Sequence, residues 1–252
     1  MKKLNSIITT LIISSCGATA LASIDEGRFV VLRSGHASLS SNLTGSGTST
    51  ALQASSGILF DVDVSYQPES NTDRYGLSYF NATTNQTTGT GVTPRTVDVE
   101  VLSYQLHWTR QPWSEGLLSN FRFGLGYGYL ESGASNTTPF VVMTNQKSHG
   151  PVLLVEHGAE PLPKFLVISK FQVYVPFELT ESVQRTGYNR ATIGLEASLD
   201  LEYLVQENFA ISLGVGYQHQ QSRFEGTGTR GVTDGTDARK MLKIPVGIKI
   251  GY

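Results

Sequence analysis

Hydrophobic and polar residues alternate along much of this chain, most regularly between positions 190 and 203. The apolar set there is Ala191, Ile193, Leu195, Ala197, Leu199, Leu201 and Tyr203. Successive side chains of a β-strand point to opposite faces, so the pattern predicts a strand with one apolar and one polar face. A strand of this length exceeds the roughly five or six residues that are usual in soluble proteins. It is typical of a tilted strand that crosses a membrane.

The same alternation predicts about ten strands along the chain. They span 28–39, 57–67, 73–82, 96–109, 118–131, 148–158, 163–180, 186–205, 207–220 and 238–252. The connections alternate between two kinds. Short ones lie at 68–72, 110–117, 159–162 and 206; long polar ones lie at 40–56, 83–95, 132–147 and 221–237; and 181–185 alone breaks the rule. Short turns at one end and long loops at the other are typical of outer-membrane barrels. We therefore predict an all-β fold, a transmembrane antiparallel up-and-down β-barrel of about ten strands, within a range of about 8 to 12.

Aromatic residues recur at one end of the predicted strands. Nine of the ten strands place an outward-facing aromatic residue near the periplasmic turns. These residues are Phe29, Tyr66, Tyr75, Trp108, Phe121, Phe165, Tyr203, Phe209 and Tyr252. Aromatic side chains favour the membrane–water interface, where membrane barrels carry girdles of them. The row favours a membrane barrel over a soluble periplasmic β-sandwich, which is the main structural alternative.

The composition agrees with a wall that faces lipid. Charged residues make up 16% of the 252 residues, whereas soluble domains carry about a quarter. Hydrophobic residues reach only 39%, and the 26 glycines exceed the usual share, which argues against helical bundles and coiled coils. A net charge of −2 argues against nucleic-acid binding, which needs a basic face.

The first 22 residues have the features of an export signal. Lys2 and Lys3 precede an apolar stretch from Ile7 to Ile13, and Ala20-Leu21-Ala22 provides a small-x-small cleavage pattern. This predicts a signal peptide at 1–22 and a mature barrel domain at 23–252. Cys16, the sole cysteine, leaves open a second possibility, which is processing at that residue with attachment of a lipid.

The last strand carries the most specific family signal. Ile244, Val246, Ile248 and Ile250 alternate up to the terminal Tyr252. This segment resembles the C-terminal insertion signal of bacterial outer-membrane β-barrel proteins, and the chain is also similar in size to solitary autotransporter-type barrels. The resemblance implies recognition by the barrel assembly machinery and insertion among outer-membrane lipids. Pro245 departs from the pattern, since a polar residue is usual there.

Inward positions of the predicted strands carry charges of both signs. The lumen set is Arg122, Lys170, Glu196, Asp200, Glu202, Lys243 and Lys249, with Gln105 and His107 beside it. With the hairpin after the seventh strand centred near Val183, Lys170 is expected directly across from Glu196. Paired charges in a narrow barrel predict a plug, because ions removed from water must be paired. The alternative is a narrow porin-like channel whose selectivity these residues tune.

Catalytic and metal-binding signals are weak in this sequence. None of the histidines, at 36, 107, 149, 157 and 219, lies in a motif known from barrel hydrolases, and adjacent Glu156 and His157 point to opposite faces of a regular strand. Asp234 and Asp237 lack the ligand density of a calcium loop. We therefore predict a non-enzymatic surface barrel without a cofactor. A barrel hydrolase is the third hypothesis, and any extracellular ligand is unspecified.

Overall fold

Antiparallel strands make up nearly all of the described chain. The computed structural model describes residues 27–46, 48–68, 72–88, 96–116, 118–134, 145–182, 187–226 and 233–251. The predicted signal segment, Cys16 and Tyr252 lie outside these residues. Within them, no helix is long and apolar enough to cross a membrane.

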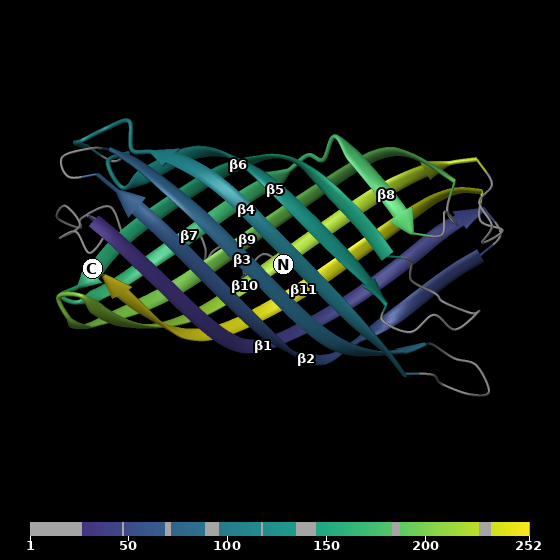
Figure 1. Ribbon diagram of the computed structural model, residues 1–252, viewed down its shortest axis with the longest axis horizontal. Helices are drawn as coiled ribbons and strands as arrows, with labels where there is room; N and C mark the ends of the chain where they lie inside the picture. The colour runs from purple at the N-terminus through teal and green to yellow at the C-terminus, as the bar shows by residue number, and fades with distance from the viewer. Residues whose placement is uncertain are drawn as a thin grey trace, which may run out of the picture.

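Eleven strand segments follow one another in a meander. They are β1 Gly27–Ser46, β2 Thr48–Gln67, β3 Asp73–Thr88, β4 Thr96–Arg110, β5 Phe121–Ala134, β6 Asn145–Leu162, β7 Phe165–Tyr174, β8 Glu178–Ser182, β9 Tyr188–Gln206, β10 Phe209–Glu225 and β11 Thr233–Gly251. The first strand pairs with the last, which closes the sheet into a barrel (Figure 1). Both β7 and β8 pair with β6, so they occupy one strand position, and the predicted ten-strand antiparallel barrel is confirmed.

The strands are longer than the alternation predicted. The segment 40–56, expected as a loop, is the upper part of β1 and β2, which run to Ser46 and resume at Thr48. The strands β3, β5, β6, β10 and β11 also extend into the expected long loops. Polar residues stand on both faces of these segments, as exposed Asn42 and buried Ser41 do on β1, so the segments pair without alternating in hydropathy. We call this end of the barrel the loop end and the opposite end the turn end.

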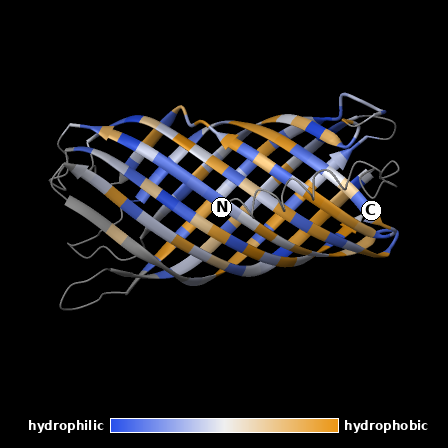
Figure 2. Cartoon of the chain, turned by 180° about the vertical axis from the view of Figure 1, so that it is seen from behind, coloured by the Kyte–Doolittle hydropathy of each residue, from blue (hydrophilic) through white to orange (hydrophobic). Residues whose placement is uncertain are grey.

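The outer surface of the barrel is apolar over its middle and turn end (Figure 2). Large hydrophobic side chains are well exposed on neighbouring strands, among them Ile58 at 74%, Leu106 at 63% and Leu125 at 55%. A soluble monomer rarely exposes a continuous apolar surface of this kind. The belt is the lipid-facing surface of a transmembrane barrel.

Two rows of aromatic side chains border this belt. At the turn end, Tyr66, Tyr75 and Tyr203 are exposed. Trp108, Phe121, Phe165 and Phe209 are half-buried and alternate with inward residues. A second row, absent from the sequence prediction, runs Phe60, Tyr79, Tyr104 and Tyr129, with neighbouring ring centroids 5.2 to 6.4 Å apart.

Phe29 does not belong to the outer girdle. It is only 5% exposed and lies inside the barrel, on the same face of β1 as Val31 and Arg33. The prediction was wrong because residues 29–32 are all apolar, so hydropathy leaves the phase of this strand undetermined. Arg33 sets the phase, since an arginine facing mid-membrane lipid costs about 2–4 kcal/mol.

Candidate functional site: a layered lumen

The inward side chains of β11 show how the lumen is layered. From the loop end to the turn end they include Arg239, Met241, Lys243 and Lys249. Arg239, Met241 and Lys249 are at most 4% exposed, and Lys243 lines a cavity. One strand thus crosses a polar layer, an apolar layer and two charged layers, and other strands contribute partners to each.

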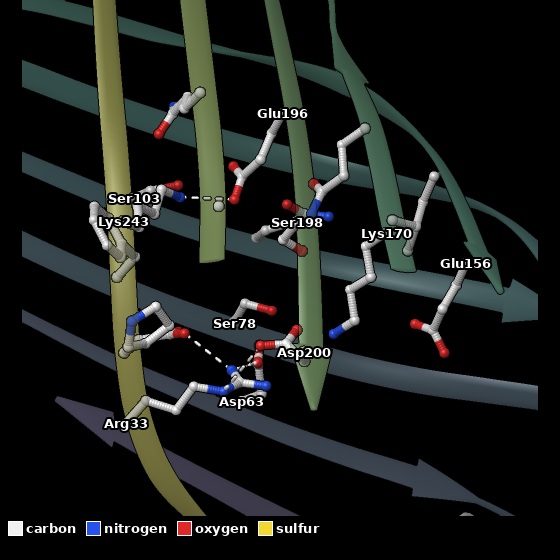
Figure 3. A pocket seen from close by; sticks show the side chains of 18 of the residues that line it. Arg33, Asp63, Ser78, Ser103, Glu156, Lys170, Glu196, Ser198, Asp200 and Lys243 are labelled. Carbon is white, nitrogen blue, oxygen red and sulfur yellow. Dashed lines mark hydrogen bonds and ion pairs between the residues drawn. The ribbon is translucent and has the colours of Figure 1, made fainter. Parts of the chain in front are cut away.

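The middle of the lumen is organised around Arg33. Its Nη1 donates to Asp63 Oδ2 at 2.6 Å and to Asp61 Oδ2 at 3.0 Å, and its Nε lies 4.0 Å from Asp200 Oδ1. The aspartates come from two strands, since Asp61 and Asp63 are on β2 and Asp200 is on β9 (Figure 3). Arg33 thereby compensates several carboxylates in a space where unpaired charge is costly.

Two lysines complete this arrangement. Lys243 Nζ donates to Glu196 Oε1 at 2.7 Å and lies 4.3 Å from the centroid of the Phe80 ring. Lys170 points toward Asp200, and none of the described residues forms an ion pair with it within 4 Å (Figure 3). We call the seven charged residues the central cluster: Arg33, Asp61, Asp63, Lys170, Glu196, Asp200 and Lys243. They surround a cavity of about 110 Å³.

A second charged layer closes the turn end. Lys249 Nζ donates to Glu202 Oε2 at 3.1 Å, with both side chains 2% exposed, and lies 4.5 Å from the Phe29 ring centroid. Arg74 on β3 forms an ion pair with Glu156 on β6. These pairs join strands that are not neighbours in the sheet, since β10 separates β9 from β11, and β4 and β5 separate β3 from β6.

Arg122 belongs to the same layer. Its Nη2 donates to Gln67 Oε1 at 2.7 Å, and its Nη1 donates to the carbonyl of Thr72 at 3.2 Å. We call this set the turn-side layer: Gln67, Arg74, Arg122, Glu156, Glu202 and Lys249.

An apolar collar separates the central cluster from the loop end. It consists of the buried residues Ala37, Leu39, Leu59, Phe80, Ala82, Val99, Val101, Leu130 and Met241. Above it, Arg239 on β11 donates to the carbonyl of Ser132 on β5 at 2.8 Å and pairs with Asp237 at 3.1 Å. Gln146 on β6 donates to Asp237 at 3.0 Å. These bonds also connect opposite walls.

The lumen residues expected from the sequence face inward, but one predicted pairing is wrong. Lys170 lies across from Ser198, and Glu196 lies across from Gln172. The prediction counted back from a hairpin between two regular strands, whereas the chain between β7 and β8 is interrupted at 175–177. The shift is two residues, which leaves every side chain on its predicted face.

Several lumen charges were absent from the sequence prediction, namely Arg33, Asp61, Asp63, Arg74 and Glu156. Asp61 and Asp63 alternate with apolar residues in the sequence, so that signal was readable. The pairing of Arg74 with Glu156 could not be read from the sequence. The two residues are 82 positions apart, and only the folded barrel brings them together. On β11, Ile244, Val246 and Ile250 lie on the outer face, 40% to 52% exposed.

The histidines do not assemble a catalytic group in the part of the chain that the structure covers. His149 is hydrogen-bonded to the Tyr127 hydroxyl at 2.6 Å, and His157 packs on the Phe121 ring. Only His107 lines the central cavity. No described histidine shares a hydrogen bond with a carboxylate or a serine, and no group of three or more described His, Cys, Asp or Glu side chains could hold a metal ion.

Comparisons with known proteins extend the fold assignment. No family model and no curated protein matches the sequence. Among solved structures, the Escherichia coli outer membrane protease OmpT matches with a TM-score of 0.58 at 9% identity, covering 92% of this chain and 99% of that one.

Two further matches have lower TM-scores. The Pseudomonas aeruginosa outer membrane protein OprG has a TM-score of 0.38 at 16% identity, with coverage of 90% and 97%. The translocator domain of the Neisseria meningitidis autotransporter NalP has 0.39 at 9%, with 100% and 96%. The match to OmpT confirms, at the level of fold, the expected resemblance to bacterial outer-membrane β-barrels.

Proposed function

We propose that the protein is a closed, non-enzymatic barrel of the Gram-negative outer membrane that presents its polar loop end to the exterior. The apolar belt and its aromatic borders support membrane insertion. The outward row Ile244, Val246, Ile248 and Ile250 on β11 supports recognition by the barrel assembly machinery. Removal of an N-terminal signal at 1–22 remains part of this proposal.

Bonds between separate strands inside the lumen are the main support for a closed barrel. Arg74 reaches from β3 to β6, and Arg239 reaches from β11 to β5. A cavity of about 110 Å³ lies between the apolar collar and the turn-side layer, and cavities of about 40, 20 and 30 Å³ lie beside it. Ten strands are close to the size at which side chains fill a barrel. The lumen therefore acts as a structural core, and the extended strands at the loop end offer a platform for contacts outside the cell.

Planar-bilayer recording tests this function. The purified protein is expected to give no discrete conductance steps under conditions in which a porin, recorded as the control, gives them readily. Steps from the wild-type protein that disappear when Glu196 and Lys243 are both changed to alanine would establish the narrow channel instead. Hydrolysis of peptide or ester substrates by the wild-type protein, lost in His107→Ala, would overturn the non-enzymatic assignment.

A further inference from the structure

The barrel wall has a seam at the loop end. The β7–β9 ladder ends at the pair Tyr174 and Gly194, and β8 pairs with β6 alone among the described strands. In Figure 1, β8 turns away from the course of β9. The edges of β8 and of the upper part of β9 are therefore not joined by a ladder. Exposed Val175 and Phe177 border the seam on one side, and Ile193 borders it on the other.

The sequence accounts for this seam. Val175 and Phe177 donate their N–H groups to the β6 carbonyls of Pro151 and His149, at 3.1 and 3.0 Å. Successive residues of a strand direct their N–H groups to opposite neighbours, so residue 176 should donate toward β9. It is a proline and has no N–H to donate. Gly150 accommodates the resulting bend, since a Cβ there would lie 2.6 Å from the Cα of Pro176.

Tyr174 lies at the inner end of the seam. Its ring packs between two glycines: a Cβ at Gly194 would lie 3.2 Å from its Cβ, and one at Gly128 would lie 3.5 Å from its Cε2. Its hydroxyl donates to Ser148 Oγ at 3.1 Å. Tyr174 also lines a cavity of about 40 Å³ just inside the wall. The ring also packs against the apolar collar, so one hydrogen bond and apolar contacts hold it between the seam and the cavity.

Three glutamines connect this small cavity to the central one. Gln105 on β4, Gln172 on β7 and Gln218 on β10 line both cavities. Their side-chain amides form no hydrogen bond with any other described residue. Amides carry both donors and acceptors, so three of them around one space suit a guest whose groups also donate and accept hydrogen bonds. The two cavities together are similar in size to an engineered cavity of about 150 Å³ that holds benzene.

We propose that this glutamine-lined cavity binds a small uncharged polyol, of the size of glycerol, which enters sideways through the seam when the Tyr174 ring moves. An uncharged guest fits because the central cluster sets three cations, Arg33, Lys170 and Lys243, against four carboxylates. Its charges nearly balance, so an added ion would gain little there in return for losing its water. The lateral route fits because the apolar collar and the bonds of Arg239 lie toward the loop end, and the bonded turn-side layer lies toward the turn end.

Thiol labelling tests the role of Tyr174. Ser103 lines both cavities, so Ser103→Cys in a Cys16→Ser background places a single reporter thiol there. The folded protein in lipid vesicles is treated with methyl methanethiosulfonate, a small neutral reagent. Tyr174→Ala is expected to raise the labelling rate at least about tenfold, whereas the matched control Tyr104→Ala, in the outer aromatic row, changes it less than twofold. Equal rates in the two variants would overturn the role of Tyr174.

Two further measurements test the route and the guest. Pro176→Ala restores the missing donor and is expected to slow labelling about threefold or more, whereas an unchanged rate would show that access does not use the seam. Glycerol is expected to protect the thiol, and sucrose at equal osmolarity is not, because it is too large for the cavity. Protection should disappear when Gln105, Gln172 and Gln218 are all changed to leucine. Equal labelling rates in glycerol and in sucrose would show that the cavity holds only water and would refute the binding proposal.

Discussion

Removing Arg33 should destabilise the barrel more than removing any exposed cation. Its side chain is 6% exposed and contacts Asp63 at 2.6 Å and Asp61 at 3.0 Å. Breaking a buried ion pair by deleting one partner costs about 3–5 kcal/mol, because the remaining charge stays buried without compensation. We therefore expect Arg33→Met to lower the free energy of unfolding by about 3–5 kcal/mol. With a urea dependence of about 2 kcal/mol per molar, the midpoint falls by about 1.5–2.5 M.

Urea unfolding in lipid vesicles, followed by tryptophan fluorescence, measures this change. Arg190→Ala is the matched control, since its pair with Glu225 is 65% and 52% exposed and should contribute less than about 1 kcal/mol. The triple variant Arg33→Met, Asp61→Asn and Asp63→Asn removes the two carboxylates that Arg33 contacts most closely and should recover most of the loss. A midpoint shift for Arg33→Met no larger than that of the control would refute the reasoning, and so would failure of the triple variant to recover stability.

Three other substitutions test separate parts of the barrel by the same unfolding assay. Leu106→Lys, in the lipid-facing belt, should cost about 2–4 kcal/mol, and Thr83→Lys near the loop end about 1 kcal/mol or less, so equal costs would contradict the position of the belt. Gly150→Val should cost at least about 1–3 kcal/mol because its side chain meets the bend in the wall, whereas Gly216→Ala, with an ordinary 3.5 Å contact, should be neutral or slightly stabilising. Phe29→Ala should cost about 3–5 kcal/mol as a buried aromatic, and a loss below about 1 kcal/mol would return Phe29 to the outer girdle.

The strand count and the two faces of the barrel were predictable because alternation acts locally. Every second residue from Ala191 to Tyr203 is apolar, and no neighbouring strand is needed to read that signal. The strand from Gly27 shows where it fails: four consecutive apolar residues hide the phase, and Phe29 was placed outside. The polar ends of strands such as β1 were missed for a related reason, since polar residues on both faces there remove the alternation.

Pairings inside the lumen were not predictable from local patterns. Arg74 and Glu156 are brought together by the tilt and stagger of the closed sheet, which no single segment encodes. The interruption of the seventh strand position was partly readable, because Pro176 cannot donate to a ladder in the interior of a sheet. Reading that proline as a break would also have avoided the pairing of Lys170 with Glu196.

The layering of the lumen explains how a chain with so little charge stabilises a polar interior. Most of the described charged side chains that face inward are held by residues from another strand, as Lys249 on β11 is held by Glu202 on β9, so these ions cross-link separate strands of the wall. The apolar collar between the central cluster and Arg239 supplies the packing that ion pairs lack, and it lowers the polarity of the space in which those pairs lie. Closure is therefore distributed over several levels. Loss of one pair should weaken the barrel without opening it, whereas a continuous water path requires the collar and both charged layers to be removed together.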